Sequence, residues 1–396
     1  MSIENLTGLN ILVVSPNEWG DMRVSKHNYA ETLAQRGNRV FFLNPPSSKA
    51  RARFVIEDVA GIPNLSTVTY RPFAPYSLRF HSRGLFNAIA RRHVGWLLTR
   101  IGVQFDVVWC FDLNLYSDLR WFEAPLKIFH PVDQVILRHQ VDVAKHADLV
   151  FSVSDEILGS LREHHLPKLR IEHGVSGAFV NLAERCLSVR EYVPNRPIKV
   201  GYVGNLLMPF IDREAMLGLI ERHPEIEFHL WGPREAKESN VGANDDGSLF
   251  IGRLARHQNV ILQGPKTPTE IAGKIGDVDI LLMCYSVSRD PNRGCNSHKI
   301  LEYMSTGRVI VANHVSDYAE QHGLIEMMPA DGSRTLLEVF DTVVANVERH
   351  NAVDNRSRRL QRALDNSYPK QIDRISAFRN TIAGATANRP SERRRR

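Results

Sequence analysis

Short apolar runs recur along the whole chain, and a polar loop and a helix-spaced segment follow most of them. The runs are near-continuous rather than alternating, which is typical of parallel strands covered by helices on both faces. The predicted strands are residues 10–15, 40–43, 65–70, 106–111, 126–129, 148–153, 169–171, 198–203, 227–231, 259–264, 280–285 and 308–312. Because strands alternate with helical segments, the sequence predicts an α/β fold of Rossmann-like, doubly wound parallel sheets.

Helical spacing marks the connecting segments. The predicted helices are residues 23–36, 85–101, 296–304, 336–347 and 357–383, together with segments that begin at 155 and 268. Pro369 is expected to break the last helix. Residues 240–252 are predicted to be a loop, since acidic residues and glycines gather there. Two interpretations of 85–101 stay open, a core-packed helix with solvated arginines and a basic amphipathic helix lying on a bilayer.

The pattern divides the chain into two halves. Residues 1–180 form one predicted domain, and 181–197 are polar with two prolines, as in a linker. The strand and glycine pattern restarts at 198 and continues to 360. Residues 361–383 form a last helical segment, and 384–396 end in four arginines and are predicted to be a basic, disordered tail.

The segment 279–313 carries the clearest chemical signal. A buried strand leads into a polar loop, and a helix opens at Asn296 and Ser297 with Lys299 in its first turn. A helix that begins beyond the carboxyl end of a parallel strand offers unpaired N–H groups to a phosphate. Glu302, one turn further on, could bond ribose hydroxyls. The spacing fits a capping box with Glu302 as return partner and a solvated Lys299 equally well.

The motif Asn-Ser-x-Lys-Ile-Leu-Glu-Tyr-Met-x-x-Gly-Arg-x-Ile-Val resembles the donor-site signature of GT-B glycosyltransferases of the group 1 class. The resemblance implies two Rossmann-like domains facing across a cleft, with the nucleotide-sugar in the C-terminal domain and a last helix that crosses back to the first. It implies that Glu302 binds the ribose and that the helix start meets the diphosphate. Gly294 stands where many members have a glutamate, so the chain resembles the sub-group lacking it. Transfer with retention is expected by analogy.

The remaining site predictions follow from this resemblance. The diphosphate is expected to contact Arg293, Asn296, Ser297, Lys299 and the Gly204-Asn205 turn. The first loop is expected to face the acceptor through Trp19, Gly20, Asp21, Arg23 and His27, although a packing role suits Trp19 equally well.

His130 and Asp133 follow a predicted strand, and they are predicted to reach the reacting sugar as catalytic residues. A histidine satisfied by backbone is the equally weighted alternative for His130. The βαβ opening has no GxGxxG, which disfavours a dinucleotide-binding oxidoreductase. His298 and Glu302 lack a third ligand nearby in sequence, so no metal site or cofactor is predicted, only a UDP- or GDP-linked sugar as co-substrate.

Composition indicates the size of the hydrophobic cores, the cellular location and the class of partner. The 396 residues, 43% of them hydrophobic, suffice for two cores, and no apolar run is long enough to span a membrane. Four scattered cysteines indicate a reduced, cytoplasmic protein. The net charge is +6, and residues 59–105 contain six arginines and no acid. No nucleic-acid motif accompanies this charge, so an anionic membrane or a lipid-diphosphate acceptor is the preferred partner, with a solvated basic face as the alternative.

Together these features predict a glycosyltransferase that uses a nucleotide-diphosphate sugar and a saccharide or lipid-linked acceptor, in bacterial envelope polysaccharide synthesis. A nucleotide-sugar epimerase of the same fold would instead need acid and base carboxylates facing the sugar. A non-catalytic GT-B binding subunit is the other alternative.

Overall fold

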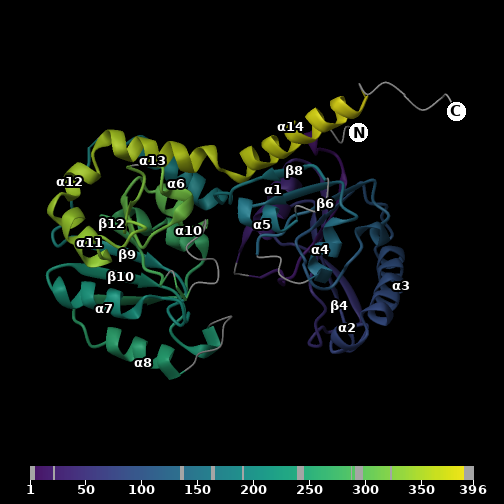
Figure 1. Ribbon diagram of the computed structural model, residues 1–396, viewed down its shortest axis with the longest axis horizontal. Helices are drawn as coiled ribbons and strands as arrows, with labels where there is room; N and C mark the ends of the chain where they lie inside the picture. Colours follow the sequence, from purple (N-terminus) through teal and green to yellow (C-terminus); the bar gives the residue numbers. More distant parts are fainter. Residues whose placement is uncertain are drawn as a thin grey trace. The chain divides into compact units, whose positions relative to one another are not determined.

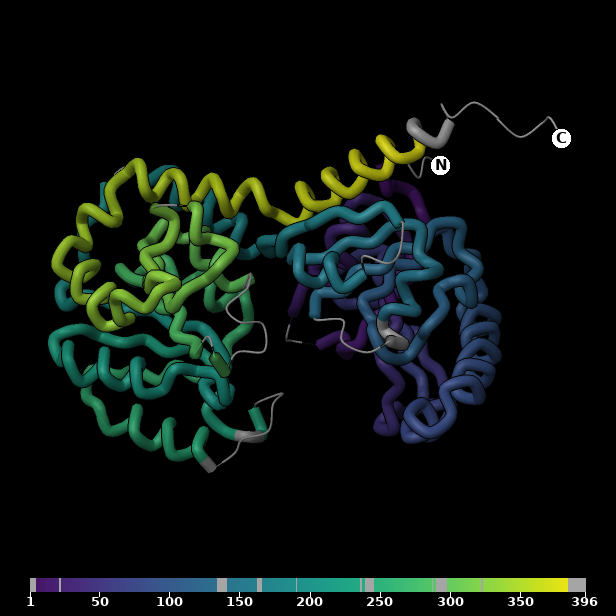
Figure 2. The backbone as a smooth tube through the Cα atoms, in the orientation of Figure 1, coloured from purple at the N-terminus to yellow at the C-terminus, as the bar shows by residue number. Residues whose placement is uncertain are grey.

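The computed structural model describes residues 5–20, 23–133, 138–161, 166–189, 191–238, 245–286, 288–289, 298–321 and 323–387. The chain divides into two compact units (Figures 1 and 2). Unit 1 comprises Met1–Glu172 and Tyr368–Arg396, and unit 2 comprises His173–Ser367. The first unit therefore contains both ends of the chain.

The sheet of unit 1 has eight strands in the order β3-β4-β2-β1-β5-β6-β7-β8. Its strands are β1 (Asn10–Val14), β2 (Arg39–Leu43), β3 (Phe54–Asp58), β4 (Leu65–Tyr70), β5 (Val107–Cys110), β6 (Leu126–Phe129), β7 (Leu149–Ser152) and β8 (Lys168–Arg170). All adjacent strands are parallel except β3 and β4, which pair antiparallel at the edge. The predicted parallel α/β sheet is confirmed, with one added antiparallel strand.

Helices cover both faces of this sheet. The helices of unit 1 are α1 (Ser25–Gln35), α2 (Leu78–His81), α3 (Arg83–Ile101), α4 (Arg138–Ala144), α5 (Asp155–Ser160) and α14 (Tyr368–Ala387). Alternate residues of β1 point to opposite cores, so that Leu12 packs with the α3 side and Val13 with α1 and α14. In α3 the apolar stripe is buried and Arg91 and Arg92 are exposed, as the core-packing interpretation expects.

The sheet of unit 2 has six parallel strands in the order β11-β10-β9-β12-β13-β14. Its strands are β9 (Lys199–Val203), β10 (Glu227–Trp231), β11 (Val260–Gly264), β12 (Ile280–Met283), β13 (Val309–Ala312) and β14 (Glu326–Met327). Its helices are α6 (Gly177–Leu187), α7 (Arg213–Arg222), α8 (Asp245–Leu254), α9 (Pro268–Ala272), α10 (His298–Met304), α11 (Leu336–Ala345), α12 (Val347–His350) and α13 (Val353–Asp365). The strand order reverses between β9 and β12, as in a Rossmann fold.

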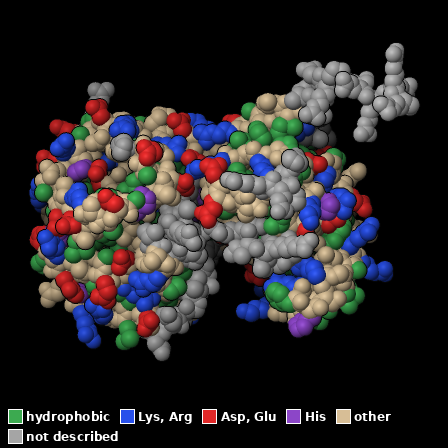
Figure 3. Space-filling view, in the orientation of Figure 1, with side chains coloured by type: hydrophobic (Ala, Val, Ile, Leu, Met, Phe, Trp, Pro, Cys, Tyr) green, Lys and Arg blue, Asp and Glu red, His purple; other side chains and the backbone are tan. Residues whose placement is uncertain are grey.

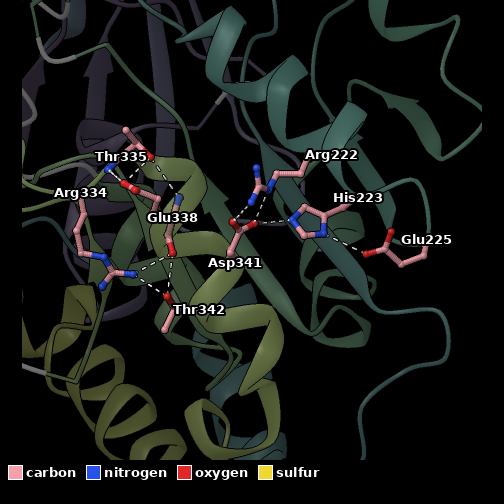
Figure 4. Close-up of polar contacts among 8 residues, drawn as sticks. All are labelled: Arg222, His223, Glu225, Arg334, Thr335, Glu338, Asp341 and Thr342. Carbon is pink, nitrogen blue, oxygen red and sulfur yellow. Dashed lines mark hydrogen bonds and ion pairs between the residues drawn. The ribbon is translucent and has the colours of Figure 1, made fainter.

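Polar contacts hold α11 beside the end of α7 (Figure 4). Asp341 accepts hydrogen bonds from His223 at 2.9 Å and Arg222 at 3.1 Å. Thr335 and Glu338 form a capping box at the start of α11, which satisfies N–H groups that a helix start leaves unpaired. These contacts orient α11 while its apolar face packs in the core with Phe340.

Several elements differ from the sequence predictions. The loop predicted at 240–252 is wrong for its described part, because α8 begins at Asp245 and buries Phe250 and Leu254 in the core. Helix α6 occupies the first part of the stretch predicted as a linker, 181–197. The strands β3 and β14 were not predicted: β14 has only two residues, and the apolar run of β3 covers only its first three residues, before Glu57 and Asp58. The break near Pro369 is confirmed, since α13 ends at Asp365 and α14 begins one residue before the proline.

Candidate functional site

The carboxyl ends of β9 and β12 lie at the point where the strand order of unit 2 reverses. Open α/β sheets bind their ligands at this place, because the connections on either side diverge to opposite faces of the sheet. Gly204 follows β9 directly, and Tyr285 comes two residues after β12. The structure therefore places the predicted Gly204-Asn205 turn and Tyr285 at the carboxyl ends of these two strands.

The backbone at the exit of β9 is packed tightly against the exit of β10. The Gly204 N–H donates to the Trp231 carbonyl at 2.9 Å. Gly232 has a φ of +150°, and a Cβ atom placed on it would lie 1.8 Å from the Gly204 carbonyl oxygen. Only glycine fits at position 232. Sequence reasoning did not choose Gly232 as a site residue, although its place between a strand and Pro233 was a usable signal.

Lys299 and the Gly204 turn come together although they are far apart in the sequence. A Cβ atom on Gly204 would lie 2.9 Å from the Lys299 Nζ atom and 2.8 Å from the Tyr202 hydroxyl. Lys299 donates a hydrogen bond to the Tyr285 hydroxyl. Its side chain is half-buried, so the interpretation of Lys299 as a solvated surface residue is wrong. The side chain of Asn205 shapes the same turn by accepting the Leu207 N–H at 3.0 Å.

Glu302 lies one turn beyond Lys299 on α10. Burial raises the pKa of its carboxyl to about 7, while the positive charge of Lys299 acts in the opposite direction. Among the described residues, none donates a hydrogen bond to this carboxylate. A half-buried carboxyl group without donors is poorly solvated when ionised, and a ligand with hydroxyl groups could supply what the protein does not.

Tyr303 fixes α10 against the sheet. Its hydroxyl accepts the Val203 N–H at 2.7 Å and lies 3.4 Å from the Leu282 carbonyl, so it bonds the ends of both β9 and β12. Burial raises the pKa of this phenol, which keeps it neutral. Because Tyr303 is the neighbour of Glu302 in the chain, this anchor sets the direction in which Lys299 and Glu302 project. Tyr285 and Tyr303 are supporting residues that the sequence predictions did not include.

His298 precedes Lys299, and its ring lies 5.8 Å from the His173 ring, edge to face. Burial, with the nearby His173 and Lys299, lowers the pKa of His298 to about 3. His298 therefore stays neutral near pH 7. His173 begins the segment His-Gly-Val-Ser, residues 173–176, so this segment comes close to the start of α10.

The first loop of unit 1 is anchored by His27. The Val24 N–H donates to His27 Nδ1 at 3.2 Å, and Nε2 lies 3.0 Å from the Glu18 carbonyl. Burial lowers the pKa of His27 to about 4, so the ring is neutral and donates through Nε2. The Trp19 ring packs against both His27 and Phe42, which also stack on each other, as the packing interpretation expects.

Gly20 and Arg23, the other described members of this loop, are accessible to solvent. The Arg23 guanidinium covers the Trp19 ring at 4.0 Å, and Gly20 is exposed. The Trp19 N–H donates to Asn44 at 2.8 Å. Trp19, Arg23 and His27 therefore form one cluster, of which Arg23 is a half-exposed charged member.

His130 and Asp133 differ in their surroundings. His130 is 1% exposed, and its Nδ1 accepts from the Trp109 indole at 3.3 Å. Four aromatic rings surround it, so His130 lies in the core rather than open to substrate, and its bond to Trp109 is to a side chain and not to the backbone that the alternative expected. Asp133 is exposed. The buried Lys26, which sequence reasoning missed, has its pKa lowered by burial and raised less strongly by Asp133.

Four of the predicted site residues, Asp21, Arg293, Asn296 and Ser297, lie outside the described residues. Within the described part of the chain, no group of three His, Cys, Asp or Glu side chains is arranged to hold a metal ion. No described helix is long and apolar enough to cross a membrane.

Comparison with known proteins identifies the fold. No family model and no curated protein matches the chain. Among solved structures, a sucrose-phosphate synthase from Thermosynechococcus elongatus is 14% identical with a TM-score of 0.65, covering 95% of this chain and all of that one. HepE from Anabaena in complex with UDP-glucose is 14% identical with a TM-score of 0.60, at 95% and 100% coverage. The lipopolysaccharide outer core galactosyltransferase WaaB is 14% identical with a TM-score of 0.59, at 94% and 100% coverage. The chain has the GT-B fold, as predicted.

Proposed function

We propose that the protein is a glycosyltransferase that moves a sugar from a nucleoside diphosphate to a saccharide or lipid-linked acceptor in bacterial envelope polysaccharide synthesis. The observation that carries the proposal is the meeting of Gly204 and Lys299 at the reversal point of the unit 2 sheet, with Glu302 one turn beyond Lys299 on α10. The likeness to HepE, whose structure holds UDP-glucose, and to WaaB, a lipopolysaccharide galactosyltransferase, supports the donor and acceptor classes.

In this proposal the donor diphosphate lies on the Gly204-Asn205 turn. The absence of a side chain on Gly204 lets an anion approach the backbone, and the Lys299 ammonium lies at the same place. Arg293, Asn296 and Ser297 complete the diphosphate contacts. Of these groups, the Gly204 turn and the Lys299 ammonium are in place before the reaction begins, and with Arg293, Asn296 and Ser297 they would stabilise the negative charge that develops on the leaving diphosphate. The proposal assigns this charge to protein groups rather than to a metal ion.

Glu302 receives the ribose hydroxyl groups in this scheme. Two hydroxyl donors to one carboxylate favour its ionised form, so donor binding lowers the pKa that burial raises in the free protein. Tyr303 holds the helix in place, and Tyr285 holds Lys299 beside the turn. Ribose recognition thereby positions the nucleotide half of the donor, and the transferred sugar extends beyond the diphosphate.

Unit 1 would hold the acceptor through the loop of Trp19, Gly20, Asp21, Arg23 and His27. Because His27 is buried, its part is to hold the loop, while Arg23 is placed to meet an acceptor phosphate or hydroxyl. The catalytic assignment of His130 and Asp133 and the retention of stereochemistry stay predictions. Asp133 is the exposed member of that pair, with Lys26 beneath it.

Calorimetry with UDP- and GDP-sugars tests the donor site. Replacing Glu302 with alanine removes two charge-assisted hydrogen bonds, and we expect donor affinity to fall by about 10- to 100-fold. Glu214→Ala, an exposed glutamate of α7, is the matched control and should bind donor as the natural protein does. Unchanged affinity in Glu302→Ala removes Glu302 from the site and with it the main support for the proposal.

Product analysis separates the alternatives. A glycosyltransferase consumes donor and releases nucleoside diphosphate only when a suitable acceptor is present. An isomerised nucleotide-sugar formed without acceptor would establish the epimerase instead. Donor binding without turnover across a panel of saccharide and lipid-linked acceptors would establish a non-catalytic binding subunit.

Contact with an anionic membrane is the second part of the proposal, and α2 with the start of α3 carries it. Tyr76, Phe80 and Leu85 are 40%, 68% and 54% exposed, within the acid-free stretch 59–105. The Arg79 guanidinium lies over the Phe80 ring at 4.6 Å. Figure 3 shows basic, hydrophobic and histidine side chains together at the lower right, where Figure 1 draws α2. Apolar side chains among arginines suit the headgroup region of an anionic bilayer.

Sedimentation with phosphatidylglycerol vesicles tests this contact. We expect Phe80→Ser to reduce the bound fraction several-fold, because an aromatic side chain is lost from the inserted surface. Leu249→Ser, equally exposed at 68% but in unit 2, is the control and should not change binding. Equal binding of both variants, or no binding of the natural protein, would contradict the membrane contact.

A further inference from the structure

Two arginines of unit 2 lie side by side at the edge of the sheet opposite to the candidate donor site. Arg308 immediately precedes β13, and Arg356 lies on α13. Between them is Gly307, with a φ of +71°, where an added Cβ atom would lie 3.4 Å from the Cβ atom of Arg356. The two side chains therefore start from backbone segments in contact. Burial raises the pKa of the Cys186 thiol, and both arginines act against this effect, so both charges lie near Cys186.

Most donors of these two guanidinium groups find no acceptor. Arg308 has one long hydrogen bond, from Nη2 to the Gly276 carbonyl at 3.4 Å, and Arg356 has one to the Cys186 carbonyl at 3.5 Å. The Nε and Nη1 atoms of both groups are buried and unpaired among the described residues. Arg356 is 3% exposed. Buried donors are nearly always paired in folded proteins, because an unpaired one loses its hydration without replacement.

A third arginine shows how this fold satisfies a structural guanidinium. Arg359, on the same helix and fully buried, donates to the carbonyls of Leu324 at 3.0 Å, Gly307 at 3.1 Å and His350 at 2.9 Å. Arg356 has no such set of acceptors although it is almost as deeply buried. The difference indicates that Arg308 and Arg356 are not explained by packing alone.

Within the described residues neither arginine takes part in an ion pair. The nearby buried Asp279 is already occupied, since it accepts from the Tyr192 hydroxyl at 2.8 Å and the Lys199 N–H at 2.9 Å. Arg308 instead covers the ring of Tyr192 at 4.7 Å. Burial and the charge of Arg308 lower the pKa of Arg356, as expected for a cation that lacks a counter-ion.

A cavity of about 360 Å³ opens at Arg356. Its other lining residues are Cys186, Leu187, Val189, Val353, Ser357 and Leu360. Leu187, Val189 and Val353 are each about half exposed and form an apolar rim. Arg356 is the charged residue of the lining, and Arg308 lies beside Arg356 but does not line the cavity. A cavity of this size accommodates a small ligand.

We propose that Arg308 and Arg356 bind a phosphate group at this cavity, as a second anion site of unit 2 apart from the one at Lys299. Four unpaired N–H-bearing atoms on two guanidinium forks exceed what the two oxygens of one carboxylate match well, whereas a phosphate offers more acceptor oxygens. The phosphate comes either free from solution or on a molecule whose apolar part lies on the rim. The site is next to the segment that leads into β9, because Arg308 covers the ring of Tyr192 and Tyr192 lies in that segment.

Alkylation of Cys186, followed by peptide mass spectrometry, tests the site without using activity. Inorganic phosphate and hexyl phosphate are titrated at constant ionic strength, and the alkylation rate of the Cys186 peptide is measured. We expect at least about 5-fold protection in the natural protein. Protection by hexyl phosphate at a tenfold lower concentration would identify an amphipathic ligand, and equal concentrations would identify free phosphate.

Three variants decide where the phosphate binds. Arg308→Gln should abolish protection and should fold, because an unpaired charge is removed. Arg358→Gln, an exposed arginine of α13, and Lys299→Met, at the donor site, should retain protection. Phosphate should also raise the melting temperature of the natural protein more than that of Arg308→Gln. Absence of protection in the natural protein, or equal protection in Arg308→Gln, would overturn the proposal.

Discussion

Polar side chains near the carboxyl ends of the two sheets differ in how completely the protein itself satisfies their hydrogen bonds. In unit 1, both ring nitrogens of His27 are bonded to the main chain, and Asp112 accepts the N–H groups of Asn114 and Leu115. In unit 2, Glu302 has no donor among the described residues, and Lys299 is held only by Tyr285 beside a bare glycine turn. Similar topology thus gives a loop whose polar groups are hydrogen-bonded to the protein in unit 1, and polar groups that could still bind a ligand in unit 2.

The completeness of these hydrogen bonds distinguishes structural from ligand-binding polar residues at equivalent positions of the two sheets. A side chain whose hydrogen bonds are completed by its own backbone stabilises the loop, and its loss is expected to reduce stability. A side chain left incomplete costs stability in the free protein, and its loss is expected to reduce binding. Four predictions test this comparison.

The largest difference in unfolding free energy is expected between glycine replacements near the carboxyl ends of the two sheets. Gly232→Ala would force a Cβ atom to within 1.8 Å of the Gly204 carbonyl oxygen, so we expect unit 2 to lose more than about 3 kcal/mol of unfolding free energy. Gly20→Ala, in the unit 1 loop, meets no atom within 4 Å and should change stability by less than about 0.5 kcal/mol. Urea denaturation measures both. Similar values for the two variants would show that the β9 and β10 exits relax easily.

A smaller loss is expected when His27 is replaced. His27→Ala removes a buried ring and leaves the Val24 N–H and the Glu18 carbonyl without their partner, which should cost about 3 kcal/mol. Glu302→Ala should leave stability at pH 7 unchanged or higher, because it removes a carboxyl that lacks donors. Denaturation of the two variants side by side measures this. A larger loss of unfolding free energy in Glu302→Ala than in His27→Ala would contradict the structural role of His27 and the ligand-binding role of Glu302.

The smallest effect is a pH dependence at Glu302. Its pKa is about 7 in the folded protein and near 4.5 in the unfolded chain, so the folded state holds a proton that the unfolded state has lost. Relative to Glu302→Gln, stability is therefore full below about pH 4.5, and it falls by about 2 kcal/mol between pH 5 and 7. Denaturation of both proteins between pH 5 and 8 measures this difference, and parallel stability curves would contradict it.

Donor binding reports on the same group. Because ribose hydroxyls favour the ionised carboxylate, binding near pH 6 should release a proton, and donor affinity should rise with pH up to about 7. Calorimetry in two buffers of different ionisation enthalpy detects the proton. Proton release that persists in Glu302→Gln would assign it to another group.

Much of the fold was predictable because its signals are local. Near-continuous apolar runs identified most strands of both sheets. The strands β3 and β14 were missed because β14 has only two residues and the apolar run of β3 is three residues long. Helix α8 was assigned as a loop because glycine and aspartate dominate its start, while its burial depends on the core it meets.

The site was predictable only in part. Lys299 and Glu302 could be chosen because they share one helix and one motif. His130 illustrates the limit, since a histidine after a strand looks the same in sequence whether it faces a ligand or four aromatic rings.

By itself the sequence determined the two parallel sheets, the order of their elements and the helix that carries lysine and glutamate one turn apart, because periodicity and helix spacing act between near neighbours. Only the tertiary structure decided that Gly204 lies against Lys299, that Gly232 admits no side chain and that Arg308 lies beside Arg356. These meetings depend on strand order and helix packing, which join residues distant in the chain. Burial then set the proton affinity of Glu302 and His27, since desolvation is a property of the packed neighbours and not of the residue.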